Sequence, residues 1–296
     1  MTTFSHEQFD YKSYAQHRPA PTKSVFDAIL TYHDGPLDKC IDLGCGHGVA
    51  ARGLAEHFKS VTGIDPSEGM LREARARTSA SHLEYRRSKA ETLPFIPDQS
   101  ISLVIACQAA HWFDAEHVWK EMTRVVQSKG TVAFWNWGRY YLIGHHGADE
   151  ILRRFTEEDL GSYWSQPGRS IWNERMRPME CRDLGNWEDL TRLQYEPCLD
   201  ALASGIGGGI RMHMPLTLGG LEGLVRTWSP VHEWRKAHPD VLSVKEGGAG
   251  DIVDSVMQEI VEADEDWRNF TAFGGNWREI KIDLEMRSIL LMARRK

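Results

Sequence analysis

Residues 40–48 read Cys-Ile-Asp-Leu-Gly-Cys-Gly-His-Gly, and this stretch decides the fold. A short apolar run leads to an acid at Asp42, and glycines then follow at alternate positions, Gly44, Gly46 and Gly48. Glycine has no side chain, so the backbone of such a turn can come close to a bound ligand. The pattern therefore predicts a turn from a strand into a helix, with free backbone N–H groups that face a ligand.

A second acid lies at the distance that a nucleoside ligand requires. Residues 61–65 predict a strand that ends at Asp65, which lies 21 residues after Gly44. In doubly wound folds a carboxylate at about this distance takes the ribose hydroxyls. The third glycine of the turn comes one residue earlier than in the dinucleotide pattern G-x-G-x-x-G. This spacing makes a nicotinamide-dependent dehydrogenase the least favoured of the nucleotide-binding alternatives.

The first half of the chain alternates between strand and helix patterns. We expect strands at 39–43, 61–64, 82–86, 101–106 and 131–135, and helices at 23–32, 50–58, 66–76 and 115–126. The run at 101–106 is apolar almost throughout, as in a strand covered on both faces. Short crossovers between successive strands predict an α/β fold with a doubly wound, mostly parallel, Rossmann-like sheet.

The alternation stops after residue 138, and the later region is rich in tryptophan and arginine. We expect helices at 216–234 and 252–263 and a strand at 280–292, and the pattern near 190–196 is compatible with a further strand. These patterns divide the chain into four parts. We expect an N-terminal lid and helix at 1–35, a ligand-binding core at 36–138, a helical cap insertion with the substrate region at 139–280, and a closing strand of the sheet at 281–296.

Composition excludes several classes of protein. A formal charge of −7 disfavours a nucleic-acid surface, because phosphate binding requires a basic patch. The sequence has no run of 18 apolar residues, so we expect no membrane span. The five cysteines are scattered, which is typical of reduced thiols in a cytoplasmic protein. The histidines show no metal-ligand spacing, so we predict no metal site.

The glycine turn together with Asp65 resembles motif I of class I S-adenosylmethionine-dependent methyltransferases. Four further stretches resemble the trans-aconitate 3-methyltransferase group within the type 11 small-molecule methyltransferases. The resemblance implies one catalytic domain with an inserted cap, S-adenosylmethionine as cofactor, and methyl esterification of a small carboxylic acid. The stretches are Thr3-Phe4-Ser5 with Tyr14 to Pro19, Ala110 to Asp114, Tyr163 to Ser170, and Val225 to Ser229.

The same resemblance implies a set of cofactor-binding residues. One departure concerns residues 88–91, Ser-Lys-Ala-Glu, where many relatives have an aspartate that receives the adenine amino group. Lys89 offers no acceptor on its side chain, so the Ala90 backbone or Glu91 would hold the adenine edge. The expected cofactor-binding residues are Tyr14, Arg18, Asp42, Gly44, Cys45, Gly46, Gly48, Asp65, Pro66, Ser67, Met70, Ala90, Glu91 and Cys107.

A carboxylate acceptor requires no base, because it is ionised at neutral pH, but its other carboxylates need a cation. Arginine suits this task, since its planar fork donates two parallel hydrogen bonds. We expect Arg169 and Arg226 to bind substrate, while Arg18 closes over the cofactor or adds a third contact.

His111 would hydrogen-bond the substrate, or act as a base if the acceptor were a hydroxyl, and we favour the binding role. Three tryptophans are expected at the substrate site. Trp112 would stack near the adenine or wall the pocket, and Trp164 and Trp228 would form an apolar roof that excludes water.

Two alternative functions remain at this stage, and the oligomeric state is also open. The acceptor could be a hydroxyl or an amine of another small metabolite, which His111 would favour. The protein could also be a regulatory protein that keeps the fold without turnover, although the intact glycine turn speaks against loss of cofactor binding. A monomer or a homodimer fits the sequence equally well.

Overall fold

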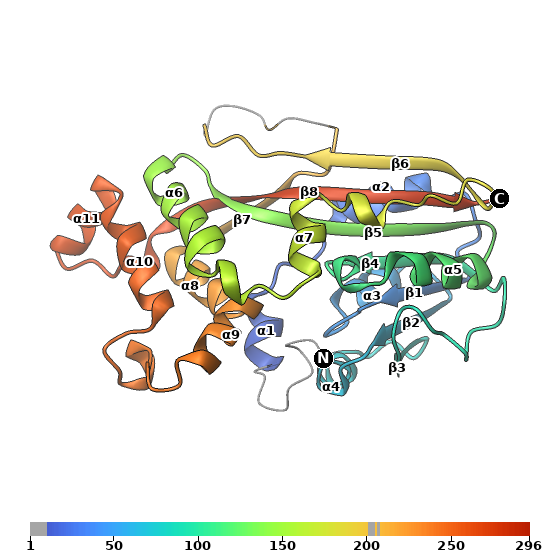
Figure 1. The fold of residues 1–296 in the computed structure, drawn as a ribbon, viewed down its shortest axis with the longest axis horizontal. Coiled ribbons are helices and arrows are strands. Elements are labelled where there is room, and N and C mark those ends of the chain that lie inside the picture. The colour runs from blue at the N-terminus through green and yellow to red at the C-terminus, as the bar shows by residue number, and fades with distance from the viewer. Residues whose placement is uncertain (1–10, 201–204, 206–207) are drawn as a thin grey trace.

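The computed structural model describes residues 11–200, 205 and 208–296, and its centre is an eight-stranded sheet (Figure 1). The strand order is β3-β2-β1-β4-β5-β8-β6, and β7 pairs with β8 outside this path. The strands are β1 Lys39–Leu43, β2 Ser60–Asp65, β3 Leu83–Arg87, β4 Ile101–Cys107, β5 Val126–Leu142, β6 Trp187–Tyr195, β7 Met212–Thr217 and β8 Lys281–Arg295.

Strands β1 to β5 run parallel, and β8 runs antiparallel to β5, β6 and β7. The prediction of a mostly parallel α/β sheet is therefore confirmed. The chain order reverses direction between β1 and β4, because β1 to β3 extend to one side and β4 to β5 to the other. In open α/β sheets ligands bind at such a switch point, outside the carboxyl ends of the strands.

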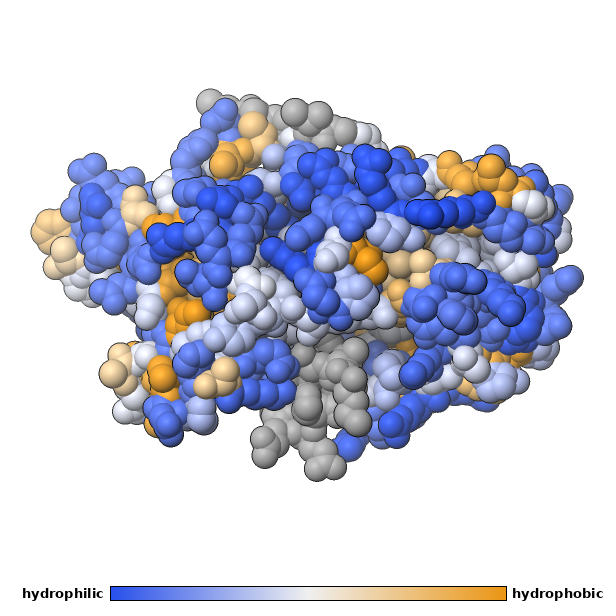
Figure 2. Space-filling view, viewed as in Figure 1, coloured by the Kyte–Doolittle hydropathy of each residue, from blue (hydrophilic) through white to orange (hydrophobic). Residues whose placement is uncertain are grey.

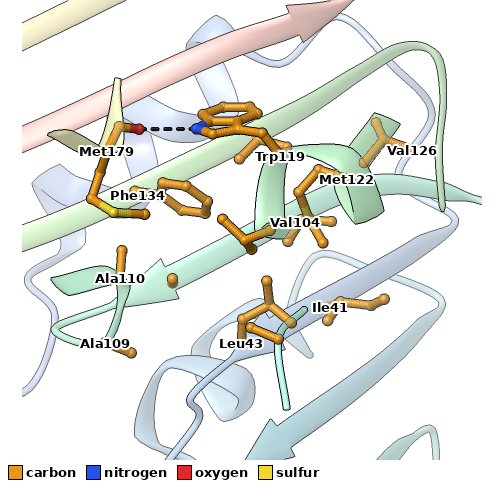
Figure 3. Packing of buried hydrophobic residues seen from close by; sticks show 14 of the residues in the cluster. Ile41, Leu43, Val104, Ala109, Ala110, Trp119, Met122, Val126, Phe134 and Met179 are labelled. Carbon is orange, nitrogen blue, oxygen red and sulfur yellow. Dashed lines mark hydrogen bonds between the residues drawn. The ribbon is translucent and has the colours of Figure 1, made fainter. Parts of the chain in front are cut away.

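Both faces of the sheet are covered by hydrophobic cores, as alternation along the strands requires. On β4, Val104 and Ala106 belong to one core, while Leu103 and Ile105 belong to the other. Figure 3 shows the first core, where Trp119 packs over the sheet and its indole N–H donates to the Met179 carbonyl oxygen at 3.0 Å.

Helices supply the outer layers of these two cores. Helices α2, α3 and α4 place apolar residues in one core, and α5 places residues in the other. Side-chain caps begin two of them, since Ser67 accepts from Met70 N and Asp114 accepts from His117 N. The bounds are α1 Tyr11–His17, α2 Lys23–Tyr32, α3 Val49–Leu54, α4 Glu68–Ala76 and α5 Ala115–Val125.

A third core lies at one end of the molecule, where β5 and β8 extend beyond the parallel strands (left in Figure 1). The helices around it are α6 His146–Arg154, α8 Leu218–Arg226, α9 Ser229–Ala237, α10 Ile252–Glu262 and α11 Glu265–Ala272. Helix α7, Gly168–Asn173, lies closer to the middle of the sheet, where Gly168 approaches the Trp112 ring.

Several expected elements differ from the observed ones. The predicted helix 216–234 is three elements, because the chain is strand up to Thr217 and breaks again at Trp228. Pro230 causes the second break, since proline is tolerated in the first turn of a helix but not in its interior. Strand β5 is longer than 131–135, so the expected boundary at residue 138 falls inside it. Strands β6 and β8 confirm the patterns near 190–196 and 280–292.

Two features of the described residues concern possible partners. No helix within the described ranges is long and apolar enough to cross a membrane. Figure 2 shows a mostly polar face on which the hydrophobic residues form separate patches.

Candidate functional site

The glycine turn leaves β1 with three residues in the left-handed region, at φ 65° for Gly44, 53° for Gly46 and 80° for Gly48. A Cβ atom at Gly44 would lie 2.4 Å from the Ala109 Cβ, and one at Gly48 would lie 2.2 Å from the Tyr85 hydroxyl oxygen. At Gly46 a Cβ would meet nothing within 4 Å. The outer glycines thus allow close packing, and the middle one presents backbone to open space that a ligand can fill.

Two buried carboxylates lie under this turn. Asp65 accepts hydrogen bonds from Gly46 N at 2.9 Å and Ser67 N at 2.8 Å, and burial still raises its pKa to about 6. Both carboxylate oxygens of Asp42 are buried and have no hydrogen-bond partner of ordinary geometry among the residues that the structure describes. Burial raises the pKa of Asp42 to about 8, the Ala51 N–H offsets part of this rise, and the Asp65 charge adds to it.

A ligand that brings a positive charge would favour the ionised form of Asp42. S-adenosylmethionine carries both an ammonium and a sulfonium, so the unpartnered carboxylate and the open backbone at Gly46 fit it.

A hollow lies at the carboxyl end of β4 and close to the turn, since the ring of its lining residue Tyr14 has its centroid 6.0 Å from that of His47. It is lined by residues from α1, from the segment after β4, from α7 with its preceding loop, and from the start of α9. Two arginines line it, whereas no aspartate or glutamate of the described residues does. The lining residues are Tyr14, Arg18, Gln108, His111, Trp112, Trp164, Ser165, Gly168, Arg169, Trp172, Trp228 and Ser229.

Arg169 enters this hollow from α7 against two tryptophan rings. Its guanidinium carbon lies 4.5 Å from the ring centroid of Trp164 and 4.5 Å from that of Trp172. Each indole N–H donates to a backbone carbonyl, that of Thr156 or of Trp137, so both rings are fixed. Nη1 of Arg169 is buried and has no hydrogen-bond partner among the described residues.

Burial lowers the pKa of Arg169 to about 10, and the charge of Glu157 offsets little of this. The guanidinium therefore remains charged at neutral pH.

Arg18 supplies the second positive charge. Its Nη2 donates to the Thr227 carbonyl oxygen at 3.0 Å, and its guanidinium carbon lies 4.8 Å from the Tyr14 ring centroid. Its Nε is buried without a hydrogen-bond partner in the described part of the chain. A donor of this kind would be satisfied by an anionic ligand in the hollow.

His111 lies in the short turn after β4 and is buried. Its Nδ1 is 2.8 Å from Nδ2 of Asn136, which lies on β5. Burial, followed by the charge of Arg18, lowers the pKa of His111 to about 3. The imidazole is therefore neutral at physiological pH and is a weak base.

The structure does not bring Arg226 into this group, contrary to the expectation from the sequence. Its Nε donates to Glu222 at 3.0 Å, and its two terminal nitrogens donate to Asp251 at 2.8 Å and Asp254 at 2.6 Å. These contacts join α8 to the start of α10. Because three carboxylates already occupy its donors, Arg226 holds the helical end together and does not line the hollow.

The other expected site residues lie in two places. Trp112, Trp164 and Trp228 line the hollow. Glu91 accepts from Asp114 N at 3.0 Å, so this carboxylate also helps to begin α5. The remaining expected cofactor residues lie at the ends of β1, β2, β3 and β4 or in the segments that follow: Cys45, Pro66, Ser67, Met70, Ala90 and Cys107.

Sequence reasoning missed several residues of the hollow. Trp172 lies three positions after Arg169 on one helix, and residues three apart share a helix face, so this spacing could have indicated it. Gln108 follows β4 directly and exchanges two hydrogen bonds with the Trp137 backbone, at 2.9 and 3.0 Å. Asn136, which contacts His111 without lining the hollow, gave no local signal, because the two residues are 25 positions apart, on β5 and in the turn after β4.

Comparisons with known proteins agree with this geometry. Residues 41–134 match the family model described as a methyltransferase domain. The yeast (Saccharomyces cerevisiae) protein named "Probable S-adenosylmethionine-dependent methyltransferase CRG1" is 24% identical over 271 residues, covering 88% of this chain and 90% of that protein. A Dictyostelium discoideum protein with a methyltransferase name is 31% identical over 164 residues, which are 55% of this chain and 61% of that protein.

A solved structure supports the fold. A protein from Anaeromyxobacter dehalogenans, described as a type II methyltransferase, superposes with a TM-score of 0.65 at 22% identity, covering 94% of this chain and 97% of that one. Residues 41–134 thus form a methyltransferase domain on a Rossmann-like sheet. The chain is an S-adenosylmethionine-dependent methyltransferase, and S-adenosylmethionine is its cofactor.

Proposed function

We propose that this methyltransferase places the methyl group on a carboxylate oxygen of a small polycarboxylic acid such as trans-aconitate, and so forms a methyl ester. The observation that carries the proposal is the charge of the hollow. Two arginines with unpartnered buried nitrogens line it, and no described acidic side chain does. Such a site favours an acceptor with several negative charges.

The residues of the glycine turn would hold the cofactor. Asp42 would face its positive charge, the Gly46 backbone would allow close approach, and Asp65 would take the ribose hydroxyls. When bound, S-adenosylmethionine supplies a methyl group that is already activated by the sulfonium. The protein's task is therefore to align the acceptor and to exclude water.

The side chains of the hollow can perform that task. Arg169 and Arg18 would hold the carboxylates that do not react, which fixes the reacting one. Trp112, Trp164 and Trp228 wall the hollow and limit access of water. No proton has to be removed from the acceptor, because a carboxylate is already ionised at neutral pH.

The test is an assay with trans-aconitate and S-adenosylmethionine labelled in its methyl group. We expect a labelled product that releases volatile labelled methanol in mild base, because base hydrolyses a methyl ester. Two matched acceptors serve as controls. One is a monocarboxylate of similar length, which has no second carboxylate for the arginines to bind, and the other is a phenol of similar size. If the phenol or an amine is methylated and the polyacid is not, the carboxylate proposal is wrong. In that case the hydroxyl or amine alternative replaces it.

A further inference from the structure

His111 and Asn136 form a buried pair of polar side chains at the edge of the hollow. His111 is 9% exposed and Asn136 is 2% exposed. The pair joins the segment after β4 to β5. Asn136 lies one residue after Trp135, whose register partner on β4 is Cys107. His111 lines the hollow, whereas Asn136 does not. The contact with Asn136 therefore determines which ring nitrogen of His111 carries the proton that a substrate in the hollow would meet.

The hydrogen bond between the two has a defined direction. Nδ2 of Asn136 lies 2.8 Å from Nδ1 of His111, and Oδ1 of Asn136 is buried without a hydrogen-bond partner in the described ranges of the chain. If the amide were turned round, its two N–H groups would replace that single oxygen in the unpartnered position. Buried N–H groups without a partner are rarer than buried carbonyl oxygens without one. The amide therefore donates, and Nδ1 of His111 accepts.

The tautomer follows from this direction. A neutral imidazole has one nitrogen that donates and one that accepts. Since Nδ1 accepts from Asn136, the proton of the neutral ring is on Nε2.

The ring also stays neutral in its surroundings. The titratable and charged groups that line the same hollow are Tyr14, Arg18 and Arg169, and none of them is a carboxylate that would hold an imidazolium.

We infer that Asn136 is a positioning residue that fixes His111 as a hydrogen-bond donor through Nε2, and so denies the site a general base. This inference rests on the proposed function. An acceptor that is already ionised receives one more hydrogen bond, whereas a hydroxyl acceptor finds no group to take its proton. The Asn136–His111 pair would thus select carboxylates over alcohols and phenols, beside the selection by charge that the arginines provide.

The tautomer can be measured without any substrate. We expect nitrogen-15 NMR of histidine-labelled protein to show His111 as the neutral Nε2–H tautomer from pH 5 to pH 9, assigned by the signal that is lost in His111→Gln. A neutral Nδ1–H tautomer, or protonation within this range, would overturn the inference. Because the protein alone is observed, this result stands even if the assay with trans-aconitate fails.

Two replacements of Asn136 separate positioning from simple packing. In Asn136→Asp the carboxylate only accepts, so Nδ1 must carry a proton. We expect kcat/KM for the acid to fall at least tenfold and a new ionisation between pH 6 and 9 in its pH profile. Asn136→Leu removes the donor without adding an acceptor and is expected to show a fall without that ionisation. If both variants lose activity equally and neither pH profile changes, Asn136 is merely structural.

Discussion

Replacing Arg169 by methionine tests the binding of the acidic substrate most directly. Methionine keeps an unbranched apolar stem that can pack against Trp164 and Trp172, but it removes the charge. A hydrogen bond to a charged group contributes about 1.5–3 kcal/mol. At about 1.4 kcal/mol for each factor of ten, kcat/KM for trans-aconitate should fall by about 10- to 150-fold. The KM for S-adenosylmethionine should stay nearly constant.

Stability should respond in a different way. The guanidinium of Arg169 is largely buried, and Nη1 has no partner in the described part of the chain, so the free protein bears the cost of burying a charge. Its removal relieves that cost, while the lost contacts with two aromatic rings cost about 0.5–1 kcal/mol each. We therefore expect the melting temperature of Arg169→Met to remain within a few degrees of the parent value.

The assay combines steady-state kinetics with thermal unfolding, and Arg177→Met is the matched control, because Arg177 is exposed and does not line the hollow. An unchanged kcat/KM for the acid in Arg169→Met would refute the reasoning. So would an equal rise in the KM of the cofactor, because that would place Arg169 at the other ligand.

Three further results are expected. Arg226→Ala should destabilise the protein by about 3–5 kcal/mol in denaturant unfolding, because Glu222 and Asp251 lose a buried partner, and its KM values should change little. S-adenosylhomocysteine should bind more tightly as the pH rises from 6 to 8, by at most about tenfold per unit, since its ammonium favours the ionised form of an Asp42 whose pKa is about 8. Calorimetry should show the proton released on binding, and Asp42→Asn should abolish the pH dependence. Trp172→Leu should raise the KM for the acid and not that for the cofactor, because one wall of Arg169 is lost.

The cofactor half of the site could be predicted from sequence because its geometry is local. The glycines, Asp42 and Asp65 lie at the ends of two neighbouring parallel strands, and their spacing along the chain fixes their spacing in space. The strands of the parallel sheet could be predicted for the same reason. Their limits were less accurate, since β5 owes its length to pairing with β8, which lies about 150 residues later.

The substrate half depends on contacts that spacing does not encode. Arg226 and Arg169 look alike in sequence, yet one meets carboxylates 25 and 28 residues further along the chain, and the other meets two indole rings on its own segment. Arg18, which follows α1, reaches the hollow because α1 packs beside α8. Its hydrogen-bond partner Thr227 lies at the C-terminal end of α8. Residue type indicated arginines for the proposed substrate site, and the packing of helices decided which arginines line the hollow.

The distribution of charge connects the two halves. Among the described residues, carboxylate oxygens without a hydrogen-bond partner lie under the glycine turn, at Asp42, and guanidinium nitrogens without one lie in the hollow, at Arg18 Nε and Arg169 Nη1. The proposed reaction transfers a methyl group from a sulfonium cation to a carboxylate anion, and so removes both charges. An apolar surrounding favours such a reaction, because it stabilises separated charges less well than water does.

If the arginines held the reacting carboxylate itself, they would oppose that change by stabilising its charge. They assist the reaction only by holding a second carboxylate, which leaves the reacting one against the tryptophans. The proposed function therefore requires acids with at least two carboxylates, and it predicts that a monocarboxylate is a poor substrate because it would bind to the arginines in an unreactive orientation.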